Sequence, residues 1–257
     1  MNQNVIRHLG DGLVLRRATV HDTEKLAAFH GDVHRDPGAA GPDEGVAAWT
    51  RDLLQGEHPT FRVDDFLAVE DTRTGAIASS TCLISQTWTY SGIEFGVGRP
   101  ELVGTHPDYR RRGLVRALLE EVHKRSAARG EMMQAITGIP WYYRQFGYEM
   151  ALALDAARFS YAPQAPKLEE GAQEPFLVRQ ATEDDVPFLA QVYDAATKRS
   201  LVACTRDEAQ WRYELSGKSE PNVCRRDLRV IEAAGGERVG FLALSIRLWR
   251  GTLGVWV

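Results

Sequence analysis

The feature that most constrains the fold of this chain is an internal repeat. The heptapeptide LVLRRAT at 13–19 and the hexapeptide LVRQAT at 177–182 begin two segments that stay in step at a nearly constant shift. In each, the threonine precedes acidic residues and then apolar residues at helical spacing, which predicts an edge strand leading into an N-capped amphipathic helix. The match continues from Ala47-x-Trp49-x-x-x-Leu53 to Ala209-x-Trp211-x-x-x-Leu215. A repeat of this length predicts two related units.

Both copies continue into a predicted hairpin, formed by residues 66–70 with 77–85 and by residues 228–232 with 239–246. Only the first copy goes on, with predicted strands at 93–106, 132–137 and 148–153, a helix at 113–129 and a helical turn at 141–146. By the shift, Val257 corresponds to about Phe95. We therefore predict an α/β (α+β) fold with a mixed, mostly antiparallel sheet flanked by helices, followed by an incomplete second copy.

The predicted boundaries follow from this pattern. A complete domain spans residues 11–160, and the incomplete copy spans residues 176–257 and lacks the turn described below. Residues 161–175 contain several prolines and acids with little apolar periodicity, which is typical of an exposed linker.

Composition excludes several classes of function. The formal net charge is -4, so the chain has no general attraction for nucleic acid. No stretch approaches the ~20 apolar residues of a membrane helix, and the first residues lack the apolar core of a signal peptide. The three cysteines, Cys82, Cys204 and Cys224, lie far apart, without the spacing of a metal or redox site. We expect a cytoplasmic protein that binds no metal and no membrane.

The strongest chemical signal is a strand, turn and helix between Leu102 and Arg129. Pro107 and Asp108 end the strand, and Gly113 lets the backbone approach a ligand closely. The first amides of a helix lack intrahelical partners and lie at the positive end of the helix dipole. Such a turn therefore suits a pyrophosphate. Taken alone, the triplet at 110–112 is more typical of a solvated run of charge than of a binding site.

Two motifs resemble the GNAT superfamily of acyl-CoA-dependent N-acyltransferases. HPDYRRRGLV at 106–115 resembles the coenzyme motif of that superfamily, and YYRQFGY at 142–148 resembles its second, tyrosine-containing element. Together with the second copy, they look like the enhanced-intracellular-survival type. The resemblance implies that acetyl-CoA contacts the following residues: Val103, Gly104, Thr105, Arg110, Arg111, Arg112, Gly113, Leu114, Val115, Arg116, Gly138 and Ile139.

The resemblance also assigns the chemistry. Tyr143 would protonate the departing thiolate, because a phenol with a reference pKa of ~10 is protonated at neutral pH. Without the motif, Tyr143 would be read as one of several packed aromatic residues. For the general base, Glu101 and Glu94 both lie on the strand that enters the turn. His106 and His123 are predicted to be surface residues.

These observations predict transfer of an acetyl group from acetyl-CoA to a primary amine. Residues 31–65 are rich in acids and would favour a cationic acceptor, or would simply form a solvated surface. The alternative is a non-catalytic acyl-CoA-binding or scaffold module. Binding of nucleic acid is disfavoured, and homo-oligomerisation is left open.

Overall fold

The computed structural model describes residues 4–139, 141–152, 157–160, 163, 167–246 and 253–256. The chain forms two compact units. The first comprises residues 1–152 with 201–205 and 219–223, and the second comprises 153–200, 206–218 and 224–257.

The first unit contains a seven-stranded sheet. Its strands are β1 (Val5–Gly10), β2 (Leu13–Arg17), β3 (Phe66–Asp71), β4 (Ala76–Tyr90), β5 (Ile93–Thr105) and β6 (Met133–Gln134), in that spatial order, with β9 (Val202–Cys204) pairing with the far end of β4. All pairs are antiparallel except β5 with β6. This is the mixed, mostly antiparallel sheet that the sequence predicts.

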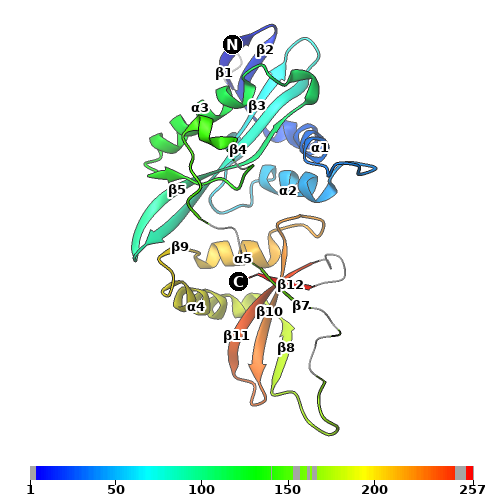
Figure 1. The fold of residues 1–257 in the computed structure, drawn as a ribbon, viewed down its shortest axis with the longest axis vertical. Helices are drawn as coiled ribbons and strands as arrows, with labels where there is room; N and C mark the ends of the chain where they lie inside the picture. The colour runs from blue at the N-terminus through cyan, green and yellow to red at the C-terminus, as the bar shows by residue number, and fades with distance from the viewer. Residues whose placement is uncertain are drawn as a thin grey trace. The chain divides into compact units, whose positions relative to one another are not determined.

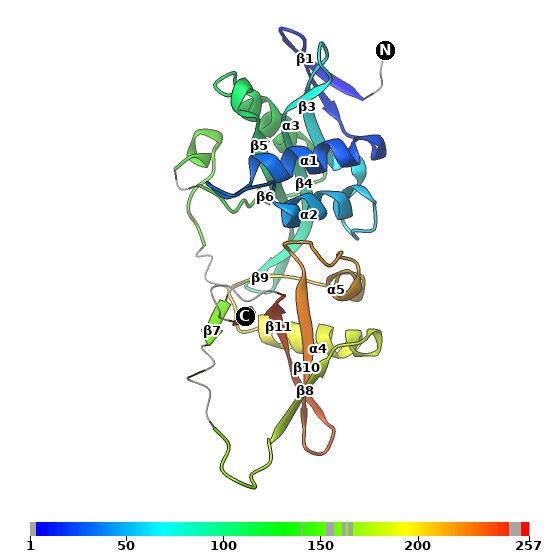
Figure 2. The same cartoon turned by 90° about the vertical axis from the view of Figure 1, so that its right-hand side faces the viewer.

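Helices cover both faces of this sheet (Figures 1 and 2). On one face, α1 (Thr23–Val33) and α2 (Glu44–Leu54) bury Leu26, Phe29 and Leu53 in a cluster with Phe66 and Cys82 of the strands. On the other face, α3 (Leu114–Ala128) buries Leu118 and Val122, which lie in the spacing predicted for its apolar side.

Two short segments from the second half of the sequence complete the first unit. Strand β9 pairs with Trp88–Tyr90 of β4. The turn at 219–223 is held by Asp52 of α2, which accepts hydrogen bonds from the Ser219 amide at 2.9 Å and from the Asn222 side chain at 2.5 Å. The sequence pattern does not predict either attachment.

The second unit contains a five-stranded antiparallel sheet. Its spatial order is β7 (Ala157–Ser160), β12 (Leu253–Trp256), β11 (Arg238–Ser245), β10 (Arg226–Ala233) and β8 (Phe176–Gln180). Its helices are α4 (Val186–Thr197) and α5 (Glu208–Ser216), which bury Leu189 and Trp211 against the strands. The predicted hairpin is confirmed as β10 and β11.

The same arrangement of ion pairs occurs in both units. In the first, Arg16 binds Asp22 at 2.6 Å and Glu70 at 2.5 Å. In the second, Arg179 binds Asp185 at 2.6 Å and Glu232 at 2.7 Å. In both, the same aspartate also accepts from the threonine amide that precedes the helix. Each arrangement ties the strand that precedes the helix, β2 or β8, to the start of that helix and to the neighbouring strand.

The end of the first domain differs from the prediction. The strand predicted at 132–137 is limited to Met133–Gln134, and the helical turn predicted at 141–146 is a 3-10 turn, η4 (Tyr143–Phe146). Residues 148–152 form no strand, and residue 153 lies outside the described residues, as do 161, 162 and 164–166 of the predicted linker. The segments at 132–137 and 148–152 are too short to show a clear alternation of apolar and polar residues. Their conformation is therefore decided by tertiary contacts. Within the described residues, no helix is long and apolar enough to cross a membrane.

Candidate active site

The predicted coenzyme turn is a rigid connection between β5 and α3. A 3-10 turn, η3 (Pro107–Tyr109), follows the strand, and the Tyr109 hydroxyl donates to the buried Asp71 at 3.1 Å. Arg111 and Gly113 then adopt left-handed backbone angles, with φ of 61° and 72°. A non-glycine residue at such an angle is uncommon and often marks a functional loop. The turn therefore combines a side-chain anchor on the sheet with two residues in the left-handed conformation.

The amides at the end of this turn and at the start of α3 have no acceptors among the described residues. From Arg111 to Arg116, no described residue accepts a hydrogen bond from the backbone N–H groups, and the first helical bond runs from Ala117 to Gly113 at 3.1 Å. A side-chain cap on α3 is also lacking among the described residues, since its N-cap is Gly113. Consecutive unpaired amides at a helix N-terminus form a concave anion site, which fits a pyrophosphate.

The arginine side chains of the turn differ in their contacts. Arg112 donates to Asp11 at 3.1 Å, and Arg116 donates to Gln145 at 3.3 Å and stacks on Phe146. Arg110 and Arg111 have no ion pair with any described residue. Two of the predicted coenzyme residues thus brace the site through their side chains, and two remain available to an anion.

Strand β5 is distorted where it approaches the turn. Leu102 has a φ of 54°, and the pairing of β5 with β4 shifts between Ser80 and Cys82, which is the signature of a β-bulge. Strand β6 pairs with β5 only at Val97 and Gly98. The backbone of Val103–Thr105 therefore pairs with β4 on one side and has no strand partner among the described residues on the other. An extended ligand could pair along that side, where the backbone of Val103 also hydrogen-bonds the His34 side chain.

Tyr143 lies in η4, where its ring packs directly on Gly138. A Cβ atom at Gly138 would stand 2.2 Å from Tyr143 Cε2, so this contact requires glycine. The hydroxyl has no hydrogen-bond partner among the described residues. Burial, together with the nearby Tyr142 and Glu101, raises the pKa of Tyr143 to about 12. The residue is thus a protonated donor that lies within electrostatic reach of Glu101.

Glu101 is the better placed of the two predicted bases. It stands opposite Cys82 in the antiparallel register, so it projects to the face covered by α1 and α2. It forms an ion pair with Arg99, yet burial raises the pKa of its carboxyl more than Arg99 lowers it. Glu94 is exposed near the start of β5, roughly 23 Å away along the strand, so it lies far from Tyr143.

Histidine placement differs in part from the prediction. Both predicted surface histidines are partly buried: the His106 Nδ1 accepts from the Asp108 amide at 3.3 Å, and the His123 Nε2 contacts the Tyr148 hydroxyl at 3.0 Å. The prediction missed His34, whose Nδ1 lies 3.1 Å from the His30 carbonyl and whose ring packs against Gly104. Burial lowers the pKa of His34, so it is neutral at pH 7. Its position at the end of a helix gave no sequence signal.

Comparison with known proteins shows the family. A profile of the family described as "Acetyltransferase (GNAT) domain" matches residues 14–151. A search of curated proteins found no matching sequence. Among solved structures, N-myristoyltransferase of Saccharomyces cerevisiae with bound myristoyl-CoA is similar, with a TM-score of 0.70 and 11% identity over 95% of this chain and 62% of that chain.

Two bacterial structures are also similar. A probable N-acyltransferase from Enterococcus faecalis has a TM-score of 0.63 and 13% identity, covering 91% of this chain and 55% of that one. A GCN5-related N-acetyltransferase from Kribbella flavida has a TM-score of 0.61 and 20% identity, covering 91% and 54%. At these identities the likeness concerns the fold, and this chain spans between about half and two thirds of their lengths. The profile match covers more than half of this chain, which therefore belongs to the GNAT acetyltransferase-domain family.

Proposed function

We propose that this chain transfers an acetyl group from acetyl-CoA to a primary amine. The observation that carries the proposal is the run of amides from Arg111 to Arg116 that have no acceptor among the described residues. This run follows a strand whose Val103–Thr105 backbone has no strand partner on one side in the described part of the chain. The coenzyme pyrophosphate would bind these amides and the Arg110 and Arg111 side chains. The pantetheine arm would pair with Val103–Thr105 and pass Gly138 and Ile139.

The proposed chemistry uses Glu101 and Tyr143. The neutral amine attacks the thioester carbonyl to form a tetrahedral oxyanion, which collapses to the amide as the C–S bond breaks. The proton lost by the amine passes to Glu101, whose raised pKa suits a base that works near neutral pH. Tyr143 protonates the leaving thiolate, since its hydroxyl is unpaired and its pKa is high.

Further features of the proposal extend beyond this site. The matching arginine networks around Asp22 and Asp185 support a second half that is a degenerate copy of the first, as in the enhanced-intracellular-survival type. Residues 176–257 carry no sequence like the motif at 106–115, so we expect one acetyl-CoA for each chain of this length. We also propose that the acceptor is cationic, because the acid-rich 31–65 segment follows α1 on the Glu101 face, and that the protein acts in the cytoplasm.

Titration of the full chain with acetyl-CoA tests the proposed coenzyme site. Gly113 and Gly130 offer a matched pair, since both have a φ of 72° and a Cβ atom added at either would meet no other atom within 4 Å. Valine at either position introduces similar backbone strain. We expect Gly113→Val to abolish acetyl-CoA binding and Gly130→Val to retain it. Equal affinity in the two variants would place the coenzyme elsewhere.

Turnover tests the activity itself. Consumption of acetyl-CoA should accelerate with members of a panel of primary amines, and myristoyl-CoA, in a parallel series, should be a poorer donor. Binding of acetyl-CoA without turnover of any amine would instead favour the non-catalytic acyl-CoA-binding module.

A further inference from the structure

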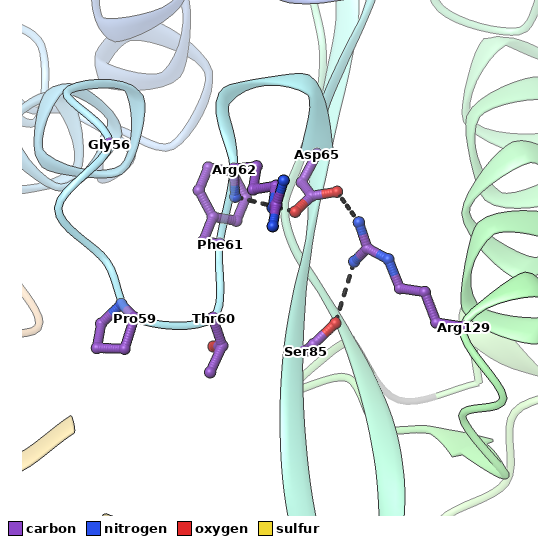
Figure 3. Close-up of a pocket in the computed structure, with 8 residues that line it drawn as sticks. All are labelled: Gly56, Pro59, Thr60, Phe61, Arg62, Asp65, Ser85 and Arg129. Carbon is purple, nitrogen blue, oxygen red and sulfur yellow. Dashed lines mark hydrogen bonds and ion pairs between the residues drawn. The ribbon is translucent and has the colours of Figure 1, made fainter. Parts of the chain in front are cut away.

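A pocket in the first unit is lined by residues outside the coenzyme turn. Its volume is about 530 Å³, and it is lined by Gly56, Pro59, Thr60, Phe61, Arg62, Asp65, Ser85 and Arg129 (Figure 3). These residues come from the loop that precedes β3, from β4 and from the residue that ends α3. The volume falls within the usual ~300–1,000 Å³ of small-molecule sites and far exceeds that of one water molecule.

The Asp65 carboxylate and the Ser85 hydroxyl of this pocket are already hydrogen-bonded. Asp65 is 1% exposed, and its carboxylate accepts from the Arg62 amide at 3.0 Å, from Arg125 at 3.1 Å and from Arg129. The Ser85 hydroxyl accepts from Arg129 at 3.0 Å and donates to Glu131 at 2.5 Å. Because two guanidinium groups already neutralise Asp65, the pocket offers no free carboxylate to a cationic ligand.

The hydrogen-bond donors of the two arginines that line the pocket, in contrast, are not all used. The dashed line at Arg62 in Figure 3 starts from its backbone nitrogen, and its guanidinium has no hydrogen bond or ion pair with any described residue. Arg129 uses one N–H on Ser85 and one on Asp65, which leaves further donors on a group with five. A ligand that fits this pocket must therefore supply acceptors, and guanidinium groups prefer the paired oxygens of carboxylate or phosphate.

We propose that this pocket binds a small anion, a carboxylate or a phosphate group, through the Arg62 guanidinium with help from Arg129. Phe61 and Pro59 supply an apolar wall, so the pocket can also hold a short carbon body attached to the anionic group. The proposal does not depend on acetyl transfer, because none of the lining residues belongs to the coenzyme turn or to the pair Glu101 and Tyr143.

Titration of the full chain with sodium phosphate and, separately, with sodium acetate tests the proposal, at constant ionic strength and pH 7. We expect saturable binding of at least one anion with a Kd on the order of 1 mM. Arg62→Gln should weaken it at least about tenfold, because a charge-assisted pair is lost. Arg199→Gln removes the same charge from an exposed arginine of the second unit and should change nothing.

The coenzyme turn could also bind phosphate, so the titration is repeated in the Gly113→Val variant. Binding that survives in Gly113→Val and is lost in Arg62→Gln assigns the anion to the pocket. Binding that is lost in Gly113→Val and kept in Arg62→Gln overturns the proposal, as does the absence of saturable binding for both anions. Acetyl-CoA affinity should be unchanged in Arg62→Gln, and its melting temperature should match that of wild type because the side chain is exposed and unpaired.

Discussion

Replacing Tyr143 with phenylalanine separates acid catalysis from packing. The variant keeps the ring and removes only the hydroxyl. The ring lies on Gly138 and packs edge to face on Tyr142, with 5.1 Å between the two ring centroids. That hydroxyl has no partner among the described residues, so its loss should change the free energy of unfolding by less than about 0.5 kcal/mol. A positioned general acid contributes about 10²–10⁴-fold, so turnover should fall by that factor. This corresponds to about 3–5 kcal/mol of activation free energy.

The assay is thiol release at saturating acetyl-CoA with any accepted amine. Tyr148→Phe is the matched control, because its hydroxyl meets His123 at 3.0 Å. It should lose about 0.5–1.5 kcal/mol of stability with little effect on chemistry. Since the pKa of Tyr143 is raised to about 12, no loss of rate from its ionisation should appear below about pH 10. Near-normal turnover in Tyr143→Phe would remove this residue from the mechanism.

Three other changes have defined outcomes. Gly138→Ala places a Cβ atom 2.2 Å from the Tyr143 ring, so turnover should fall with the fold intact; unchanged turnover would show that the ring position is not critical. Asp52→Ala leaves the donors of Ser219 and Asn222 without this carboxylate, and urea unfolding should show a loss of about 2–3 kcal/mol. His30 is fully buried, and burial and the nearby His34 lower its pKa well below 6.5. Below about pH 6.5, His30 therefore binds a proton in the unfolded chain but not in the folded chain. The free energy of unfolding of wild type should then fall by up to about 1.4 kcal/mol per pH unit. In His30→Gln this fall should be less steep.

Local patterns in the sequence predicted much of the fold. The spacing of Leu118 and Val122 and the stop at Gly130 predicted α3, and the turn residues between 70 and 77 predicted the hairpin of β3 and β4. Gly113 marked the point where the backbone adopts a left-handed angle. Such signals depend on a few neighbouring residues, so they can be read without knowing the rest of the structure.

The sequence also singled out Tyr143 and Glu101, because a motif and a strand position identify residue types. It could not tell that Arg99 pairs with Glu101, or that Glu94 on the same strand lies far from the site. Those facts follow from the register of β5 on β4 and from the bulge at Leu102, which the pairing of the two strands sets and the residue pattern does not show.

The sequence by itself therefore determined the repeat, the order of most helices and strands, and the turn that suits an anion, since each has a local periodicity or a special backbone angle. Tertiary structure alone decided that His34 lies against Gly104, that β9 completes the first sheet, and that Arg62 lines a pocket with Arg129. These contacts join residues far apart in the chain, and their free energy comes from packing and burial that no local pattern encodes.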